Sequence, residues 1–403
     1  MALALHPAMK ILVCNYEYPP VGGGGSVITA MLAEELARRH EVAVITSRCF
    51  DLAAEEVRNG VSIHRVSVPL RRHLEAASMI SLIGFAVQGI RCGREVVKRF
   101  RPDIVNTHFA LPSGPVGDLL AREAGCPNIL SVHGGDLYDP SKWTSPHRHP
   151  LLRWWIASLM RRADRVVAQS GDTARRARAF YAPELATIRI PLGIERPPPS
   201  DARREDWGLS ESDIVIVTVG RLVARKSVDR LVAMLPDLPE RVRLIVIGDG
   251  PMQPELAECA GRLGVGRRVR FAGSVSDAEK YSLLGISDIF ASTSQHEGFG
   301  LVFLEAMACG LPVVCHDRGG QTDFLRDGET GRLTGVGDHD GFVEALRKLA
   351  ESPGERRRMG VRNREIVESY FIEHCARSYE ELFEEVLARR RGAADRDRFT
   401  SID

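Results

Sequence analysis

The feature that most constrains the fold is an alternation of strand and helix patterns that runs along the chain twice, with a proline-rich interruption. Apolar stretches such as Lys10–Cys14 and Asn128–Val132 lead through turn residues into amphipathic helical patterns. The alternation stops at Pro191–Pro199 and begins again at Ile214–Val219. Because parallel strands need crossover connections, this pattern predicts two parallel sheets covered by helices.

The expected fold class is therefore α/β, with two doubly wound Rossmann-like domains that face each other across a cleft. A chain of 403 residues is too long for one ordinary core. We expect an N-terminal domain over residues 1–195, a linker over 196–212 and a C-terminal domain over 213–371. The helical pattern in 372–403 follows the second sheet, and we expect it to cross back to the N-terminal domain.

The segment from Glu297 to Glu305 carries the most specific chemistry. It reads Glu-Gly-Phe-Gly-Leu-Val-Phe-Leu-Glu, follows a strand-like stretch and continues as a helical pattern. Such a turn aims the free N–H groups of a helix start at a ligand, which favours a phosphate. Carboxylates accept hydrogen bonds from sugar hydroxyls, so the segment suits a nucleotide sugar. A tight turn followed by a solvated helix face is the structural alternative.

Two cations come from another strand-to-helix turn. Arg221 ends the strand that begins at Ile214, and Lys226 begins the next helix. Such a pair suits a diphosphate leaving group, whose charge grows as the sugar–phosphate bond breaks. In the first domain, His133 and Asp136 follow a strand and can reach a hydroxyl of the sugar or the acceptor. A histidine satisfied inside its loop is the alternative there.

The glycine run Gly22–Gly25 opens the first helix and lets the backbone come close to a ligand. It is neither a Walker loop nor a dinucleotide fingerprint, because no Gly-Lys-Ser/Thr follows and the Gly-x-Gly-x-x-Gly spacing is absent. The second strand also lacks the acidic end residue that an NAD ribose needs.

Over almost its whole length, the chain resembles the family 4 retaining glycosyltransferases with the GT-B fold (glycosyl transferases group 1). The motifs that carry this resemblance are Pro19-Pro20-Val-Gly-Gly-Gly, His133-Gly-Gly-Asp136, Gly220-Arg221 with Lys226, Glu297-Gly-Phe-Gly to Glu305, and Gly310-Leu-Pro-Val-Val with Gly319-Gly320. Departures from frequent family patterns, such as Ser227 after the lysine and Asp323 in place of a glutamate, weaken any transfer of donor identity.

The resemblance implies a retaining transfer from a UDP- or GDP-sugar to a hydroxyl acceptor, with no cofactor and no metal. It implies catalytic roles for Arg221, Lys226, Glu297 and His133. Glu297 would bind the sugar near C3 and C4, Glu305 the ribose, and His133 would lie by the 6-position. The implied donor-binding residues are Gly23, Gly24, Ser274, Val275, Gly298, Phe299, Gly300, Leu301 and Glu305. On the acceptor side it suggests Asp136 and His108.

Other functions fit the same architecture less well. A nucleotide-sugar epimerase needs acids and bases around the ring, and no such cluster appears beyond His133 and Glu297. A sugar phosphorylase usually holds pyridoxal phosphate on a lysine, and Lys226 is already assigned to the diphosphate. A non-enzymatic sugar-nucleotide-binding protein would be expected to lose Arg221, Lys226 or Glu297, and all three are present.

Charge and cysteine usage suggest the compartment and the partner. Residues 1–200 contain 25 Lys and Arg against 18 Asp and Glu, whereas residues 201–403 contain 29 against 35. This asymmetry reflects either complementary halves or simple drift in composition, or a basic first half that meets an anionic or lipid-linked acceptor or an anionic membrane surface. No nucleic acid is expected as a partner.

Eight scattered cysteines without a Cys-x-x-Cys pair, and a start at Met1–Ala8 without a charged signal region, favour a cytoplasmic location. The apolar stretch Ala76–Ile90 has basic flanks, and about 15 residues are too few to span a bilayer. It is either a buried crossover helix or a helix that lies at a membrane interface.

Overall fold

A computed structural model describes residues 8–49, 51–71 and 78–400, and the other residues lie outside the description. The chain divides into two compact units. The first contains residues 1–193 together with 372–403, and the second contains residues 194–371. The division falls inside the proline-rich segment. Residues 196–212, expected as a linker, fall within the second unit, and Arg204 Nη2 lies 2.8 Å from Asp288 Oδ2 there.

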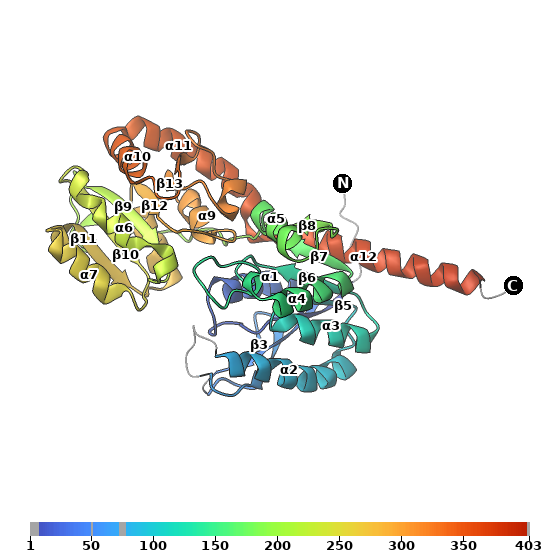
Figure 1. The fold of residues 1–403 in the computed structure, drawn as a ribbon. Helices are drawn as coiled ribbons and strands as arrows, with labels where there is room; N and C mark the ends of the chain where they lie inside the picture. Colours follow the sequence, from blue (N-terminus) through green and yellow to red (C-terminus); the bar gives the residue numbers. More distant parts are fainter. Residues whose placement is uncertain (1–7, 50, 72–77, 401–403) are drawn as a thin grey trace. The chain divides into compact units, whose positions relative to one another are not determined.

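The first unit is built on an eight-stranded sheet in the order β3-β4-β2-β1-β5-β6-β7-β8 (Figure 1). Neighbouring strands are parallel except for the antiparallel pair β3 and β4 at one edge. The strands are β1 (Lys10–Cys14), β2 (Glu41–Arg48), β3 (Glu55–Arg58), β4 (Val61–Ser67), β5 (Ile104–His108), β6 (Asn128–Val132), β7 (Arg165–Ala168) and β8 (Thr187–Arg189). The strand order reverses between β1 and β5, as in a doubly wound sheet.

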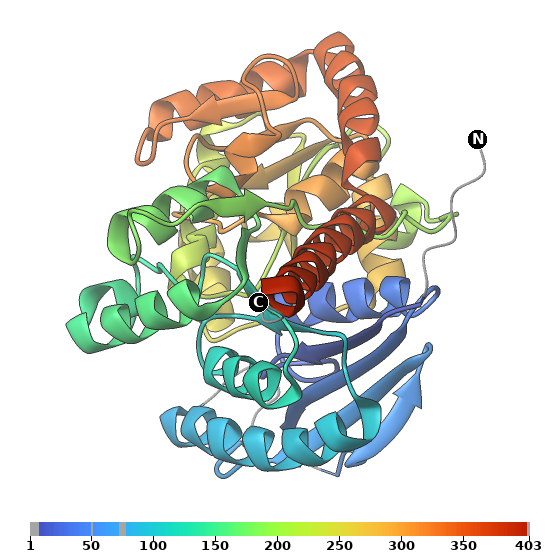
Figure 2. The same cartoon turned by 90° about the vertical axis from the view of Figure 1, so that its right-hand side faces the viewer.

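Helices cover this sheet, and one of them comes from the far end of the chain. They are α1 (Gly24–Leu36), α2 (Met79–Phe100), α3 (Ser113–Ala124), α4 (Pro150–Arg162), α5 (Gly171–Phe180) and α12 (Ile372–Thr400). Helix α12 packs against α1, and Figure 2 shows the two side by side. The α12 side chain Tyr379 is fully buried, so the C-terminal segment completes the core of the first unit.

The second unit contains a six-stranded, fully parallel sheet in the order β11-β10-β9-β12-β13-β14. Numbered within this unit, the order is the 3-2-1-4-5-6 arrangement of dinucleotide-binding folds. The strands are β9 (Ile214–Val219), β10 (Val242–Ile247), β11 (Val269–Gly273), β12 (Ile289–Ser292), β13 (Val313–His316) and β14 (Gly331–Thr334). The helices are α6 (Val228–Ala233), α7 (Gln253–Arg262), α8 (Asp277–Gly285), α9 (Leu301–Ala308), α10 (His339–Glu351) and α11 (Pro353–Val367).

The expected α/β fold with two doubly wound sheets is confirmed. The central strands are apolar and buried on both faces, as parallel strands between two helix layers must be. Three short strands, β3, β8 and β14, were not expected. Each has three or four residues with half-exposed or exposed positions, so the apolar pattern that marks the inner strands is missing.

The apolar stretch expected at Ala76–Ile90 forms the first half of α2, whereas Ala76 and Ala77 lie outside the described residues. Phe85 is buried, while Ile80, Ile83 and Val87 are exposed. The helix therefore packs with one side and leaves an apolar stripe on the other. Within the described residues, no helix is long and apolar enough to cross a membrane.

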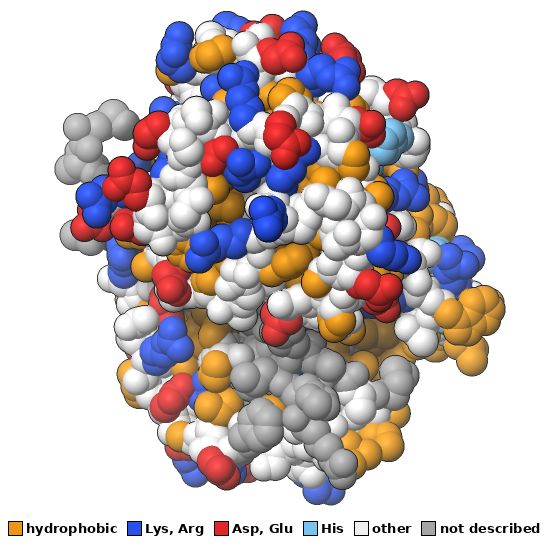
Figure 3. All heavy atoms as spheres, turned by 90° about the vertical axis from the view of Figure 1, so that its left-hand side faces the viewer, with side chains coloured by type: hydrophobic (Ala, Val, Ile, Leu, Met, Phe, Trp, Pro, Cys, Tyr) orange, Lys and Arg blue, Asp and Glu red, His pale blue; other side chains and the backbone are white. Residues whose placement is uncertain are grey.

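Figure 3 shows one face of the molecule, on which basic and acidic side chains are interspersed.

Candidate functional site

The candidate donor site lies in the second unit, where strand order reverses between β9 and β12. Two loops leave the carboxyl ends of these strands at neighbouring positions, which is where open α/β sheets bind ligands. Main-chain and side-chain hydrogen bonds join the loops. Gln295 N donates to Arg225 O at 3.0 Å, and Thr293 Oγ1 donates to Ser227 O at 2.7 Å. These bonds fix the charged residues of one loop against those of the other.

The Glu297 carboxylate lies between two cations of the neighbouring loop. Lys226 Nζ is 2.5 Å from Glu297 Oε1, and Arg225 Nη1 is 3.5 Å from Glu297 Oε2. The side chains of Glu297, Lys226 and Arg225 are only 10%, 15% and 21% exposed, respectively. Arg225 also donates a hydrogen bond to the carbonyl of His296. A carboxylate held this way is preorganised, and its cations are already in place for an incoming anion.

The electrostatics of this cluster keep Glu297 ionised. Burial by itself raises the pKa of Glu297, but the Lys226 ammonium, the Arg225 guanidinium and hydrogen bonds from Lys226 and Ser294 lower it to about 2. A permanently ionised carboxylate accepts hydrogen bonds and donates none. It can therefore bind any hydrogen-bond donor that reaches it, hydroxyl groups included.

The turn after Glu297 places a helix start beside the carboxylate. Gly300 has a φ of +95°, a conformation that favours glycine, and α9 begins at the next residue. Phe299 is buried against Phe324 and Tyr370, so its side chain anchors the turn from beneath. Its expected contribution to donor binding is thus limited to its main chain.

A second glycine turn supports the first from the loop after β13. Gly320 N donates to Glu297 O at 2.8 Å. A Cβ on Gly320 would lie 2.0 Å from Gly298 O, and one on Gly319 would lie 2.6 Å from Glu297 O. The two backbones can approach this closely only because neither position carries a side chain.

Glu305, one turn into α9, is held by a cation that the sequence did not point to. Lys280 Nζ on α8 lies 2.9 Å from Glu305 Oε1 and 2.7 Å from Asp277 Oδ1. Burial alone would lower the pKa of Lys280, but the two carboxylates raise it, so the lysine stays charged. Glu305 Oε2 is buried and has no hydrogen-bond partner among the described residues. A buried unpaired acceptor of this kind is costly unless a ligand supplies a donor.

The structure brings only some of the expected donor residues together with the Glu297 cluster. Lys226 contacts Glu297 directly, whereas Arg221 is exposed and its side chain makes no hydrogen bond or ion pair with a described residue. Ser274 and Val275 follow β11 at the same edge of the sheet. Sequence reasoning missed Arg225, although it adjoins Lys226, and Lys280, whose partner lies 25 positions away.

In the first unit, the corresponding reversal lies between β1 and β5. Helix α1 begins at Gly24 with Gly23 before it, and a Cβ on either glycine would meet no atom within 4 Å. The space beside this helix start is therefore open. His108, the last residue of β5, and His133, which follows β6, are both buried at the same edge of the sheet.

A continuous hydrogen-bond chain holds the two histidines. His108 Nδ1 lies 2.9 Å from His133 Nε2, and His133 Nδ1 lies 3.1 Å from Gln169 Oε1. Because Gln169 Oε1 only accepts, His133 Nδ1 carries the proton and His133 Nε2 accepts from His108. His108 Nε2 in turn accepts from Asn106 Nδ2 at 3.0 Å. Both ring nitrogens of His133 are thus occupied, so a sugar hydroxyl must exchange with one of these partners.

The same chain continues to the C-terminal helix. Asn106 Oδ1 accepts from Ser131 Oγ at 3.1 Å, and Ser131 Oγ lies 2.9 Å from the hydroxyl of Tyr379 on α12. Tyr379 is 1% exposed. The C-terminal helix therefore fixes the orientation of side chains that end at His133.

Asp136 closes the loop that carries His133. Its two carboxylate oxygens accept from the main-chain N–H groups of His133 at 3.0 Å and Ala110 at 2.8 Å. Burial raises the pKa of Asp136 to about 6, against the effect of these N–H groups. Both oxygens are engaged in shaping the loop, so Asp136 is placed to position His133 rather than to face an acceptor directly.

The histidine pair should make the protein lose stability in mild acid. Burial lowers the pKa of His133 from 6.5 to about 4 and lowers that of His108 as well. Below pH 6.5 these two histidines become protonated in the unfolded chain, whereas in the folded state they stay neutral until the pH is lower. The contribution of the histidines to stability is therefore complete above pH 6.5 and falls as the pH drops through 6.5 toward 4, by about 3 kcal/mol for His133 alone. The raised pKa of Asp136 acts in the opposite direction below about pH 6, so the histidine contribution is measured as the difference between the wild-type profile and that of a His133 variant.

Urea unfolding followed by circular dichroism between pH 7.5 and 4.5 measures this loss. His133→Gln should flatten the dependence, whereas His374→Gln, at an exposed position on α12, should keep the wild-type profile. An equally steep profile in the His133→Gln protein would contradict the prediction.

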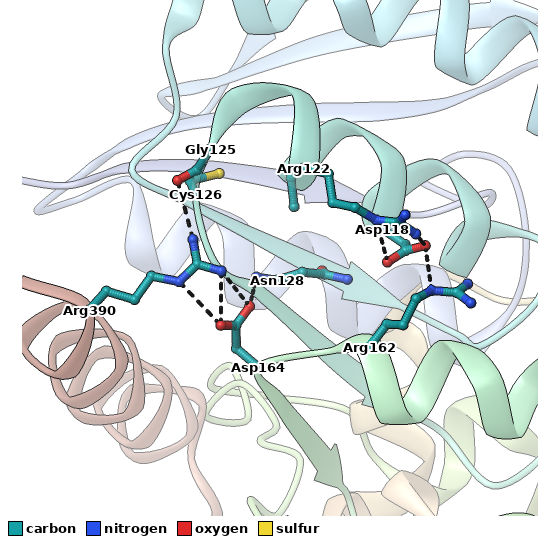
Figure 4. Close-up of a pocket in the computed structure, with 9 residues that line it drawn as sticks. Asp118, Arg122, Gly125, Cys126, Asn128, Arg162, Asp164 and Arg390 are labelled. Atoms are coloured by element: carbon teal, nitrogen blue, oxygen red, sulfur yellow. Dashed lines mark hydrogen bonds and ion pairs between the residues drawn. The ribbon is translucent and has the colours of Figure 1, made fainter. Parts of the chain in front are cut away.

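A large hollow in the first unit is not the candidate site (Figure 4). It lies at the start of β6 and β7, the edge opposite to the His108–His133 chain. Its arginines already have partners. Arg390 of α12 lies 3.0 Å from Asp164, and both Arg122 and Arg162 contact Asp118. The Arg390–Asp164 pair attaches α12 to the start of β7, and the Arg162–Asp118 pair attaches α4 to α3.

No group of three or more His, Cys, Asp or Glu side chains in the described ranges is arranged to hold a metal ion.

Two known protein families match this chain. The family described as "Glycosyl transferases group 1" matches residues 199–366, and the "Glycosyl transferase 4-like domain" matches residues 23–193. The chain is 31% identical over 380 residues to the GDP-mannose-dependent alpha-(1-6)-phosphatidylinositol monomannoside mannosyltransferase of Mycolicibacterium smegmatis, covering 88% of this chain and 92% of that protein. It is 28% identical over 389 residues to N-acetyl-alpha-D-glucosaminyl L-malate synthase of Bacillus anthracis, covering 94% and 98%.

Solved structures show the same fold. The sucrose-phosphate synthase of Thermosynechococcus elongatus superposes with a TM-score of 0.82 at 23% identity, over 94% of this chain and 99% of that one. The Anabaena protein HepE in complex with UDP-glucose superposes with a TM-score of 0.74 at 22% identity, over 94% and 100%.

Proposed function

The chain belongs to the glycosyl transferases group 1 family, and from this premise we propose that it transfers a sugar from a UDP- or GDP-sugar to a hydroxyl acceptor with retention at the anomeric carbon. The observation that carries the proposal is the Lys226–Glu297–Arg225 cluster beside the start of α9, which no side chain caps. Cations, free N–H groups and an ionised carboxylate in one place match a diphosphate joined to a polyhydroxyl ring.

In the proposed reaction, the acceptor oxygen forms a bond to the anomeric carbon while the bond from that carbon to the diphosphate oxygen breaks. The leaving diphosphate takes the acceptor's proton. Arg221 and Lys226 offset the negative charge that grows on the diphosphate, and Glu297 holds the sugar hydroxyls. No carboxylate is assigned as a nucleophile. The attack then takes place on the face that the diphosphate leaves, and no metal ion or other cofactor is required.

Glu305 is proposed to bind the ribose. Its buried oxygen Oε2 lacks a partner, and a ribose hydroxyl would supply the missing donor. Lys280 orients the carboxylate through Oε1, which leaves Oε2 for the ligand. The main chain at Ser274 and Val275, at the same edge of the sheet, would contact the base.

On the acceptor side, Gly23 and Gly24 leave room for a ligand beside the start of α1, and His133 would contact the sugar after exchanging one ring hydrogen bond. The acceptor is proposed to be anionic or lipid-linked, with the protein at the cytoplasmic face of the membrane. The relative from Mycolicibacterium smegmatis, whose name includes a phosphatidylinositol acceptor, supports this part of the proposal.

A thermal-shift screen of the purified protein against UDP, GDP, ADP and CMP, with and without their sugars and with a chelator, tests the donor proposal. A nucleotide at 100 times its Kd should stabilise the protein by about 2.7 kcal/mol. Lys280→Met should weaken the apparent affinity for the nucleotide at least tenfold, because Glu305 loses its orienting cation. The thermal shift at a fixed nucleotide concentration should then be smaller than in wild type. The matched control Lys348→Met removes an exposed lysine and should keep the wild-type affinity. No shift with any nucleotide would contradict the proposal.

A further inference from the structure

The first unit carries an unusual group of exposed large apolar side chains on α4 and on the loop that leads into it. Trp143 is 76% exposed, Leu151 is 82% exposed and Trp154 is 69% exposed. Trp155 adds a fourth partly exposed side chain at 39%. We call these four residues the tryptophan patch. Patches of this kind on a water-soluble surface mark interaction sites.

Topology places a second apolar group at the same edge. Helices α2 and α4 each follow a parallel strand, so both begin at the carboxyl edge of the sheet. They lie on one face, because α3 packs against both of them. The first turns of α2 expose Ile80 and Ile83 at 54% and 63%. Two apolar groups therefore flank the start of α3 along one edge of the first unit.

The chain around the tryptophan patch is strongly basic. Between Ser141 and Tyr181 it contains nine Lys and Arg residues but only two Asp and no Glu. Six of the nine form ion pairs with carboxylates, which leaves Arg148, Arg153 and Arg178 as the cations without a carboxylate partner among the described residues. Arg148 and Arg153 are exposed, and their guanidinium groups donate to the carbonyl oxygens of Pro140 and Phe180. Bonds to neutral carbonyls leave the positive charge uncompensated, so this surface attracts an anion.

We propose that this edge of the first unit docks on the surface of an anionic lipid bilayer. Tryptophan is enriched at the membrane–water interface, and each arginine near an anionic headgroup adds to the attraction. A bilayer accepts protruding side chains without a complementary pocket. It also meets two separated apolar groups at once, which a small partner would not.

Docking here would bring the first unit's loops to the lipid. The loop from His133 to Trp143 joins the buried histidine chain to the tryptophan patch within ten residues. This consequence rests on the proposed function, because it makes the acceptor an amphiphile whose hydroxyl head reaches the protein from the membrane. The docking itself requires no transfer reaction.

Flotation of the full chain with vesicles tests the proposal. Wild type should float with vesicles of phosphatidylcholine containing about one-third phosphatidylglycerol, and far less with phosphatidylcholine alone. Trp143→Ala/Trp154→Ala should weaken binding to the anionic vesicles at least tenfold. The matched control Val57→Ala/Val361→Ala shortens exposed apolar residues elsewhere and should bind as wild type. Brominated lipid should quench the tryptophan emission of wild type but not that of the double variant.

A charge variant provides a second test should the tryptophan variant fold poorly. Arg148→Glu/Arg153→Glu should abolish the preference for anionic vesicles while circular dichroism stays unchanged. Failure of wild type to float, or equal flotation of both variants and wild type, would overturn the proposal. So would a dimer in sedimentation velocity that the tryptophan variant dissociates, because the patch would then join two copies. The thermal stabilisation by nucleotides is measured without vesicles, so failure of membrane docking can be distinguished from failure of the proposed function.

Discussion

Replacing Lys226 with methionine or Glu297 with glutamine is expected to reduce kcat/KM for sugar transfer at least a hundredfold. The two groups are 2.5 Å apart and largely buried, so each orients the other. In the proposed reaction Lys226 meets charge that develops on the leaving diphosphate, and Glu297 fixes the ring that reacts. A hundredfold loss corresponds to about 2.7 kcal/mol of transition-state stabilisation, the size found for a single charge-stabilising group.

Steady-state kinetics with the donor found by the thermal-shift screen measure this loss. The pair should behave as a unit, so the double variant should be little worse than either single variant. Matched controls are Lys348→Met and Glu344→Gln, which remove exposed charges on α10 and should keep wild-type activity. Thermal unfolding of each variant separates a lost contact from a lost fold. Near-wild-type turnover in a folded variant would contradict the assignment of Lys226 and Glu297 to the donor site.

The Gly320→Ala substitution should have an effect of similar size although it touches no substrate. Its Cβ would lie 2.0 Å from Gly298 O and 2.7 Å from the Cα of Phe299, both main-chain atoms that cannot swing aside. The turn that carries Glu297 must then move by about 1 Å, and a misplacement of that size costs roughly a hundredfold in rate. We also expect a loss of about 1–3 kcal/mol in stability from overpacking.

Donor affinity by calorimetry and kcat/KM measure the first effect, and the unfolding midpoint measures the second. Gly285→Ala at the end of α8 is the control, because a Cβ there meets no atom within 4 Å. If Gly320→Ala bound donor and turned over as the control does, the turn after β13 would not be what positions Glu297.

The two histidines of the first unit show where sequence reasoning reached its limit. His133 could be predicted to lie at the end of a strand, because an apolar run precedes it. That both its ring nitrogens are taken by His108 and Gln169 could not, since those partners lie 25 and 36 positions away. The same holds for Lys280, whose ion pair with Glu305 depends on how α8 and α9 pack.

Local patterns in the sequence predict the inner strands, the alternation of strand and helix in two sheets, and the turn segment from Glu297 to Glu305. These follow from local periodicity and from glycines that permit only certain turns, so they need no knowledge of distant residues. The folded chain was needed to show that Arg225 joins Lys226 on Glu297, that Tyr379 ends the histidine chain, and that Gly320 supports the turn that carries Glu297. Each of these depends on the approach of segments far apart in the chain, which packing of the whole core sets and no local pattern encodes.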